Sequence, residues 1–176
     1  KITLSPGTKP YVLYHGDLST PENSTAATFL IKNVIRKVPE LKWIIAGRNP
    51  SPTLISLADT YKNIQLLSNP EENHLKQLIA EAAINILYTN QVSGVKLKLI
   101  NTLYNGHTCL ANKKMVTGSG LEDLCVIVPD EPDKIIREVR KYITLPFPEE
   151  ELLKREQIFH SVYNNQKNAL AIKALL

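Results

Sequence analysis

The sequence contains few residues of the types that mark specialised classes of protein. Its 176 residues include 2 cysteines, 1 tryptophan and 7 glycines, and no C-x-x-C pattern occurs. Disulfide scaffolds and structural zinc sites need more cysteines at closer spacing, so we interpret Cys109 and Cys125 as buried, reduced thiols rather than a metal or redox site. No run approaches about 18 apolar residues and no segment resembles a signal peptide, so we expect no membrane span or export signal.

The sequence also has no strong excess of charge. Lysine and arginine number 21 against 17 acidic residues, which gives a formal net charge of +4. This excess slightly favours an anionic ligand or a lipid headgroup surface, but it is too small to indicate DNA or RNA without a basic stripe interleaved with aromatic residues. The four histidines lack metal-ligand spacing. We therefore expect no nucleic-acid partner and no metal site.

A regular alternation of strand-like and helix-like segments runs through most of the chain. Apolar, strand-like runs occupy residues 11–15, 42–46, 63–67, 84–89, 108–111 and 124–128, and helical spacing occurs near 21–38, 51–61, 72–83, 95–104 and 131–143. Uniformly apolar strands separated by helices of about ten residues indicate a parallel sheet covered on both faces. The sequence thus predicts an α/β fold, a Rossmann-like doubly wound parallel sheet over residues 11–145, preceded by a linker at 1–10.

The residues after this predicted domain have a different character. Residues 146–176 show no strand pattern, and helical spacing occurs over 149–164 and 167–176. These residues are predicted to form a helical tail. The tail either extends past the sheet domain to another part of the protein or consists of two ordinary packing helices. Both interpretations stay open from the sequence.

Small and polar residues follow the predicted strands. They are His15-Gly16, Gly47-Arg48, Leu67-Ser68 and Ser93-Gly94. The carboxyl ends of parallel strands meet at one edge of a sheet, and such folds bind ligands there. A helix that follows Gly94 would point its free N–H groups at that edge, which suits a phosphate. Lys96 is in the first turn of this helix, where a positive charge is slightly unfavourable for the helix itself. A bound anion facing the lysine would explain its position better.

One stretch resembles a known family. Residues 91–123 read QVSGVKLKLINTLYNGHTCLANKKMVTGSGLED. They resemble the donor-site segment of glycosyltransferase family 4, which often reads G-x-[RK]-x-K-x-x-E-A-x-x-x-G-x-P-V before a G-x-E-G-L-like loop. Gly94, Lys96, Lys98, Gly106 and the loop at 118–121 match. The resemblance covers about residues 11–175 and implies the carboxyl-terminal, donor-binding half of a two-domain GT-B enzyme.

The resemblance also implies a set of substrate-binding residues and names no catalytic residue. The set is Gly16, Ser93, Gly94, Val95, Lys96, Lys98, Asn101, Gly118, Ser119 and Gly120. Lys96 and Lys98 are candidates for the donor diphosphate, because an ammonium beside a helix N-terminus can neutralise the oxygens of a leaving nucleotide. Residues two apart on a helix point in different directions, so we do not expect both lysines to point at one ligand, and a solvated helix face is the alternative for each.

The sequence departs from the family pattern at several of these positions. Ser93 and Asn101 stand where the family has two glutamates, and Asp17 stands where an arginine commonly follows the glycine. Asn101 can accept one hydrogen bond from a ribose hydroxyl but carries no charge. The glycines at 118–120 do not form a dinucleotide fingerprint, which disfavours an NAD-dependent or nucleotide-sugar-modifying enzyme and leaves a ligand loop or a plain turn.

The function implied by the resemblance is transfer of a hexose from a nucleoside diphosphate sugar to a glycan or lipid-linked acceptor, as in polysaccharide biosynthesis. It requires a missing amino-terminal acceptor-binding domain and no cofactor beyond the sugar donor, so the isolated fragment is expected to be inactive. The alternative is a degenerate, non-catalytic interaction module. The expected location is cytoplasmic, and the resemblance allows peripheral contact with the inner membrane face through the missing half.

Overall fold

A computed structural model gives the structure of the protein and describes residues 10–91, 97–163 and 173. The chain divides into two compact units, Lys1–Leu145 and Pro146–Leu176. Within the second unit, α7 spans Glu149–Val162, and the guanidinium of Arg155 lies 4.6 Å from the ring centroid of Phe147. The linker expected at 1–10 and the second tail helix expected at 167–176 lie almost entirely outside the described residues.

The first unit contains a six-stranded parallel sheet in the order β3-β2-β1-β4-β5-β6. The strands are β1 (Tyr11–Asp17), β2 (Lys42–Arg48), β3 (Ile64–Ser68), β4 (Ile84–Leu87), β5 (Thr108–Asn112) and β6 (Val126–Val128). The chain builds the sheet outward from β1 in one direction and then from β4 in the other. This order confirms the predicted Rossmann-like, doubly wound α/β class.

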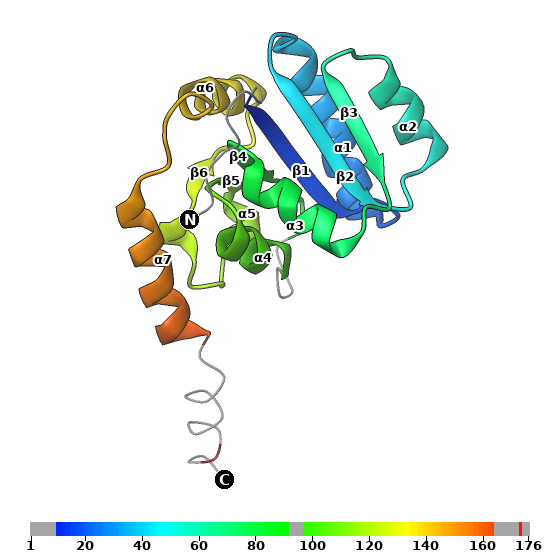
Figure 1. Cartoon of the computed structure of the whole chain (residues 1–176). Helices are drawn as coiled ribbons and strands as arrows, with labels where there is room; N and C mark the ends of the chain where they lie inside the picture. The colour runs from blue at the N-terminus through cyan, green and yellow to red at the C-terminus, as the bar shows by residue number, and fades with distance from the viewer. Residues whose placement is uncertain (1–9, 92–96, 164–172, 174–176) are drawn as a thin grey trace. The chain divides into compact units, whose positions relative to one another are not determined.

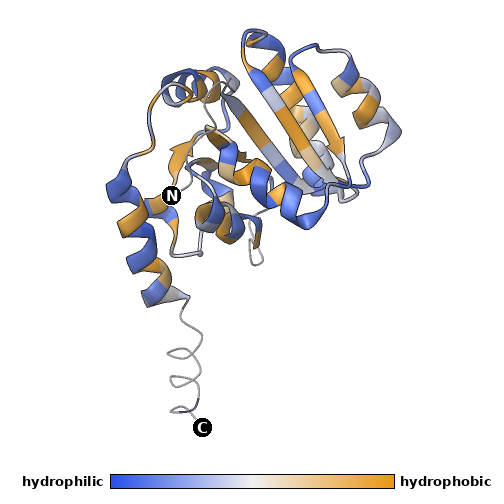
Figure 2. Cartoon of the chain, viewed as in Figure 1, coloured by the Kyte–Doolittle hydropathy of each residue, from blue (hydrophilic) through white to orange (hydrophobic). Residues whose placement is uncertain are grey.

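Helices cover both faces of the sheet (Figure 1). They are α1 (Pro21–Asn33), α2 (Pro52–Asp59), α3 (Glu72–Glu81), α4 (Leu97–Asn105), α5 (Lys113–Val116) and α6 (Pro132–Tyr142), with 3-10 turns η1 (Ile35–Lys37) and η2 (Glu122–Leu124). Alternate residues of β1 point to opposite faces: Val12 packs in a core with α1, α2 and α6, whereas Leu13 packs with α3. The strands are largely hydrophobic (Figure 2), and β1 and β2 contribute residues to both cores.

The two helices that follow β1 and β2 begin with the same local arrangement. The Thr20 hydroxyl accepts a hydrogen bond from the backbone N–H of Asn23, and the Ser51 hydroxyl accepts one from Leu54. A proline occupies the first helical position in each case, where its missing N–H costs nothing. These caps fix α1 and α2 at the carboxyl edge of the sheet.

Some predicted boundaries were wrong. Gly47 was expected to end the second strand, but β2 continues to Arg48. An added Cβ at Gly47 would overlap the carbonyl oxygen of Gly16, so this glycine permits the close approach of β1 and β2 rather than a turn. The last strand was expected from residue 124, but Leu124 ends η2 and β6 begins at Val126. Among the described residues, no helix is both long and apolar enough to span a bilayer.

Candidate functional site

The candidate site lies where the strand order reverses, at the carboxyl ends of β1 and β4. These strands are hydrogen-bonded neighbours, with Val12 opposite Ile84. The chain leaves β1 toward α1 and leaves β4 toward α4, and ligands bind at such a reversal of strand order in folds of this class. The polar residues that converge here come from β1, α1, α4 and the ends of β4, β5 and β6.

Asn23, in the first turn of α1, organises the end of β1. Its Nδ2 donates to the Asp17 carbonyl oxygen at 2.9 Å, and the Tyr14 hydroxyl donates to the Asn23 carbonyl oxygen at 3.2 Å. The Asn23 side chain also lies against Gly16, where an added Cβ would be 3.0 Å from Asn23 Cγ. The predicted site residue Gly16 therefore allows the first turn of α1 to pack directly on β1.

Lys98 reaches this same point from α4. Its Nζ donates to Asn23 Oδ1 at 2.7 Å and lies 5.5 Å from the centroid of the Tyr14 ring. The lysine is half-buried, so its charge is only partly screened by water. The structure thus brings together two of the predicted site residues, Gly16 and Lys98, through the side chain of Asn23.

His15 is buried behind Lys98 and does not line the edge. Its Nε2 lies 2.8 Å from the Thr102 hydroxyl, which is one helical turn beyond Lys98 on α4. Burial, with a smaller contribution from the Lys98 charge, lowers the pKa of His15 to about 4. The imidazole is therefore neutral at neutral pH and serves as a packed core residue that holds α4 against β1.

Asn101 is half-buried on α4, and its amide is already bonded. Its Oδ1 accepts a hydrogen bond from Asn105 Nδ2 at 2.7 Å, and the same Nδ2 donates to the Asn101 carbonyl oxygen at 3.0 Å. Any ligand hydroxyl that donates to this oxygen would share it with Asn105. The expected contact between Asn101 and a ribose stays a prediction.

A buried threonine connects the end of β4 to α1. The Thr89 hydroxyl is hydrogen-bonded to Glu22 Oε1, and it accepts a hydrogen bond from the Gln91 backbone N–H at 3.0 Å. Glu22 lies in the first turn of α1, where a carboxylate interacts favourably with the helix dipole. This contact fixes the direction in which the chain leaves β4 toward residues 92–96.

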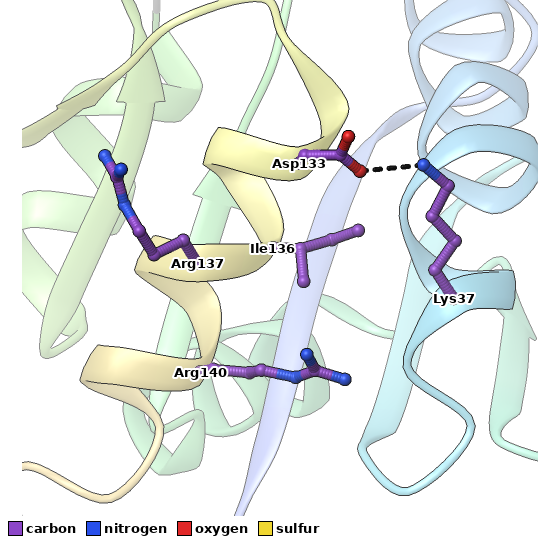
Figure 3. A pocket seen from close by; sticks show the side chains of 5 residues that line it. All are labelled: Lys37, Asp133, Ile136, Arg137 and Arg140. Carbon is purple, nitrogen blue, oxygen red and sulfur yellow. Dashed lines mark hydrogen bonds and ion pairs between the residues drawn. The ribbon is translucent and has the colours of Figure 1, made fainter.

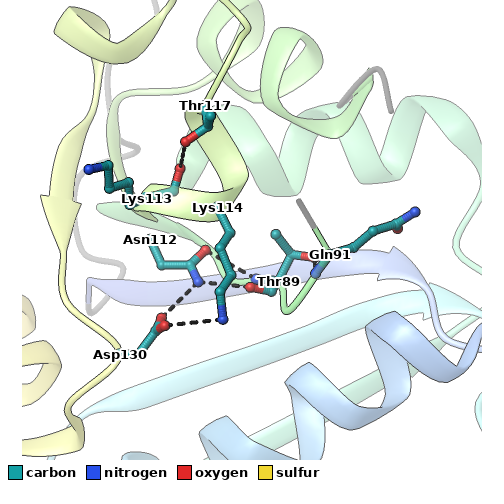
Figure 4. Close-up of polar contacts among 7 residues, drawn as sticks. All are labelled: Thr89, Gln91, Asn112, Lys113, Lys114, Thr117 and Asp130. Carbon is teal, nitrogen blue, oxygen red and sulfur yellow. Dashed lines mark hydrogen bonds and ion pairs between the residues drawn. The ribbon is translucent and has the colours of Figure 1, made fainter. Parts of the chain in front are cut away.

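Asn112 is fully buried at the end of β5, and its side chain connects β5 to the segments that follow β4 and β6 (Figure 4). Its Oδ1 accepts from the Thr89 N–H at 3.2 Å, and its Nδ2 donates to the Thr89 carbonyl oxygen and to Asp130 Oδ1, both at 2.8 Å. Lys114 Nζ lies 3.4 Å from Asp130 Oδ2. The single side-chain amide of Asn112 thus forms hydrogen bonds with groups that follow both β4 and β6.

The glycine loop forms a turn after α5. Gly118 and Gly120 have φ values of 75° and 70°, which favour glycine. The Ser119 hydroxyl donates to the Val116 carbonyl oxygen at 2.6 Å and accepts from the Leu121 N–H at 3.1 Å. The serine thus stabilises the turn itself, and the expected contact of Gly118, Ser119 and Gly120 with a ligand stays a prediction.

Comparison with known proteins adds to this geometry. No family model and no curated protein matches the sequence. AviGT4, a glycosyltransferase involved in avilamycin A biosynthesis, matches 96% of this chain with a TM-score of 0.70 and 12% identity, over 52% of its own length. WaaG, a glycosyltransferase involved in lipopolysaccharide biosynthesis, matches 97% with a TM-score of 0.63 and 13% identity, over 47% of its length.

A UDP-forming α,α-trehalose-phosphate synthase from Burkholderia xenovorans matches 87% of this chain with a TM-score of 0.62 and 10% identity, over 40% of its length. The chain has a GT-B glycosyltransferase-like fold. It spans between 40% and 52% of the three proteins named here. It therefore corresponds to about half of a GT-B structure, and at these identities the likeness concerns the fold.

Several predicted site residues of this GT-B half lie outside the described residues. They are Ser93, Gly94, Val95 and Lys96. The described residues on either side, Gln91 and Leu97, place this segment between the end of β4 and the start of α4. Within residues 10–91, 97–163 and 173, no group of three or more histidine, cysteine, aspartate or glutamate side chains could hold a metal ion.

Several polar residues of the candidate site were not predicted from the sequence. They are Glu22, Asn23, Thr89, Asn112 and Asp130. Asn23 follows the Thr20 cap by three residues, and Asn112 ends an apolar strand run, so their positions carried a signal. These positions did not identify the contacts, because Lys98 reaches Asn23 from α4 and Asn112 reaches Thr89 and Asp130 from a neighbouring strand.

Proposed function

We propose that this chain is the donor-binding half of a glycosyltransferase that moves a hexose from a nucleoside diphosphate sugar to a glycan or lipid-linked acceptor. The observation that carries the proposal is the position of Lys98. Its ammonium lies at the strand-order reversal of a GT-B half, 2.7 Å from the first-turn residue Asn23 of α1. Gly16 allows the Asn23 side chain, which accepts the Lys98 hydrogen bond, to pack directly on β1.

The electrostatics of this position suit a diphosphate. In the proposed reaction the bond from the sugar anomeric carbon to the diphosphate oxygen breaks, and negative charge develops on the leaving nucleotide. Lys98 and the positive end of α1 would stabilise that charge, and Lys96 is the second candidate for the same role. Such stabilisation is effective because the groups are held before the substrate arrives.

The proposal includes a second domain that binds the acceptor. Solved GT-B structures that match this chain extend well beyond the match, and this chain would supply only the donor site. No metal or cofactor takes part in the proposed reaction other than the sugar donor, and the chain alone should transfer no sugar. Polysaccharide synthesis in the cytoplasm, with membrane contact made by the second domain, is the proposed setting.

A second candidate function is a non-catalytic interaction module with the same fold. It is favoured by the side chains that stand in place of the family glutamates, Ser93 and Asn101, and by the bond that already occupies the Asn101 oxygen. Such a module would keep the sheet and the Asn112 network but would bind nucleoside diphosphates weakly or not at all. Nucleotide binding therefore distinguishes the two functions.

The test is a thermal-shift panel of UDP, GDP, ADP and their common sugar conjugates on the whole chain. A nucleotide at 100 times its Kd stabilises a protein by about 2.7 kcal/mol, which corresponds to a Tm rise of roughly 5–10 °C for a chain of this length. We expect a selective shift that Lys98→Met and Lys96→Met reduce. Lys98→Met keeps the apolar stem over Tyr14 while it removes the charge.

The matched control is Lys76→Met. Lys76 lies on α3 and forms an exposed i,i+4 ion pair with Glu72, with Nζ 2.6 Å from Glu72 Oε1. Its loss should leave the nucleotide-dependent shift unchanged. No shift with any nucleotide at millimolar concentration would reject the donor-binding proposal and favour the non-catalytic module.

A further inference from the structure

The two cysteines of the chain, 16 positions apart in the sequence, lie side by side in the fold. The Cys125 thiol donates a weak hydrogen bond to the Cys109 sulfur, with the two Sγ atoms 3.9 Å apart. Cys109 is the second residue of β5, and Cys125 directly precedes β6. The sequence predicted two buried, reduced thiols, but Cys125 is only partly buried.

The backbone geometry of the pair is compatible with a disulfide. Leu110 is directly opposite Val126 in the parallel β5–β6 ladder, so Cys109 and Cys125 occupy the preceding opposed positions. Cys125 has an extended backbone, with φ −124° and ψ 147°, and so continues the line of β6. Neighbouring strands are about 4.8 Å apart, which falls within the Cα separation of about 4.4–6.8 Å that disulfides span.

The two thiols differ in access to solvent. Cys109 is buried, with 2% of its surface exposed, whereas Cys125 is partly exposed. A thiol pair with one accessible member and one buried neighbour is the arrangement in which the first can react with an oxidant and the second can resolve the product. We infer that Cys109 and Cys125 form a reversible thiol–disulfide modification site, oxidised by a low-molecular-weight disulfide such as oxidised glutathione.

The reaction balances in two exchange steps. The Cys125 thiolate attacks one sulfur of oxidised glutathione, the glutathione S–S bond breaks, and one glutathione thiolate leaves with the electron pair. The Cys109 thiol then loses its proton to solvent and attacks the Cys125 sulfur, which releases the second glutathione. Two electrons pass from the cysteine pair to the glutathione disulfide, and the chain gains one S–S bond and loses two hydrogens.

The product would close a ring around residues 109–125. This ring contains α5, the turn with Gly118 and Gly120, and η2. Both exchange steps run in either direction, so the site should respond to the ratio of oxidised to reduced glutathione.

The experiment equilibrates the folded, full chain in buffers of increasing oxidised glutathione, quenches with an alkylating reagent, and measures intact mass and linked peptides. We expect a monomer that loses two hydrogens, takes up no alkylating reagent and yields a peptide containing residue 109 linked to one containing residue 125. Excess reduced glutathione should restore two alkylated thiols. Circular dichroism before the quench confirms that the chain is folded when it reacts.

The variant Cys109→Ala is the matched control. It keeps the accessible thiol and removes the resolving one, so it should accumulate a stable glutathione adduct on Cys125 that the wild-type chain does not accumulate. The inference is overturned if the folded wild-type chain keeps both thiols, stops at the same glutathione adduct, forms only dimers between chains, or acquires the bond only after denaturant is added. Because the wild-type result alone decides the question, a misfolded variant does not obscure it.

Discussion

Two polar regions of the sheet domain differ in the burial and the bonding of their polar side chains. At the carboxyl edge, Asn23, Thr89 and Asn112 are bonded to groups from several strands and helices, and Asn112 and Thr89 are fully buried. Near the start of β2, a cavity of about 460 Å³ lies between η1 and α6, lined by Lys37, Asp133, Ile136, Arg137 and Arg140 (Figure 3).

The charged side chains around the α6 cavity form ion pairs near the surface. Lys37 Nζ lies 2.8 Å from Asp133 Oδ1, and Arg140 donates to Glu40 Oε1 at 2.9 Å. Most of these side chains are exposed, so each ion pair is screened by water and contributes little to the stability of the fold. The charges around the α6 cavity pair with one another in solvent, whereas Lys98 at the carboxyl edge is half-buried and bonded to Asn23.

The largest expected effect comes from the close approach of β1 and β2 at the carboxyl edge. Gly47→Ala places a Cβ against the Gly16 carbonyl oxygen, a backbone atom that cannot move without disturbing the ladder. We expect a loss of about 3 kcal/mol in the free energy of unfolding, measured by urea denaturation. Gly118→Ala, where an added Cβ meets no atom within 4 Å but φ is 75°, should cost about 1 kcal/mol. Equal losses would contradict the close-approach explanation.

Asn112→Leu tests the buried amide network. The substitution keeps the size of the side chain but leaves the Thr89 backbone N–H and C=O without their partner. Unsatisfied buried polar groups are costly, so we expect the free energy of unfolding to fall by about 2–3 kcal/mol. Asn105→Leu, on the partly exposed side of α4, should change it by about 0.5 kcal/mol or less. A loss below 1 kcal/mol for Asn112→Leu would show that the network is not structurally important.

The pH dependence of stability tests the burial of His15. The pKa of this residue falls from 6.5 in the unfolded chain to about 4 in the fold, so the unfolded state binds the proton more readily. The contribution of neutral His15 to the free energy of unfolding should therefore be fully present above pH 6.5. It should decline as the pH falls toward 4, by about 2 kcal/mol between pH 6.5 and 5. His15→Gln should remove this part of the decline in urea denaturation. An identical decline in both proteins would show that His15 is not the group responsible.

The smallest effect is expected at the α6 cavity. Lys37→Ala removes an ion pair whose partner Asp133 has 86% of its side chain exposed. The free energy of unfolding should change by no more than about 0.5 kcal/mol, and raising the salt concentration should not alter that result. A loss comparable to that of Asn112→Leu would mean that the two regions do not differ in the way proposed.

The fold could be predicted from the sequence because its signal is local. Uniformly apolar runs such as Val12–Tyr14 and Ile84–Leu87 predict buried parallel strands, and capped helices with Thr20-Pro21 begin where expected. Lys98 was named because its segment resembles the family motif, and its contact with a donor stays a prediction. Gly47 was misinterpreted as a strand terminator because the sequence does not reveal the Gly16 carbonyl oxygen beside it.

The rest of the site depends on sheet order, which periodicity does not determine. Asn112 contacts Thr89 because β5 lies next to β4, and Glu22 contacts Thr89 because β4 lies next to β1. The proximity of Cys109 and Cys125 has the same origin, since β6 adds beside β5. Contacts between residues that are distant in sequence were therefore the part that the sequence did not supply.

The most direct test of the donor-site proposal is isothermal titration calorimetry of the chain with UDP, GDP and ADP, comparing wild type with Lys98→Met and Lys76→Met. A charge-assisted bond from Lys98 to a diphosphate predicts that one nucleotide binds and that Lys98→Met weakens it about tenfold, since each tenfold change corresponds to about 1.4 kcal/mol. Lys76→Met should bind like wild type. Equal affinity for wild type and Lys98→Met, or no binding of any nucleotide, would contradict the assignment of this edge as a donor site.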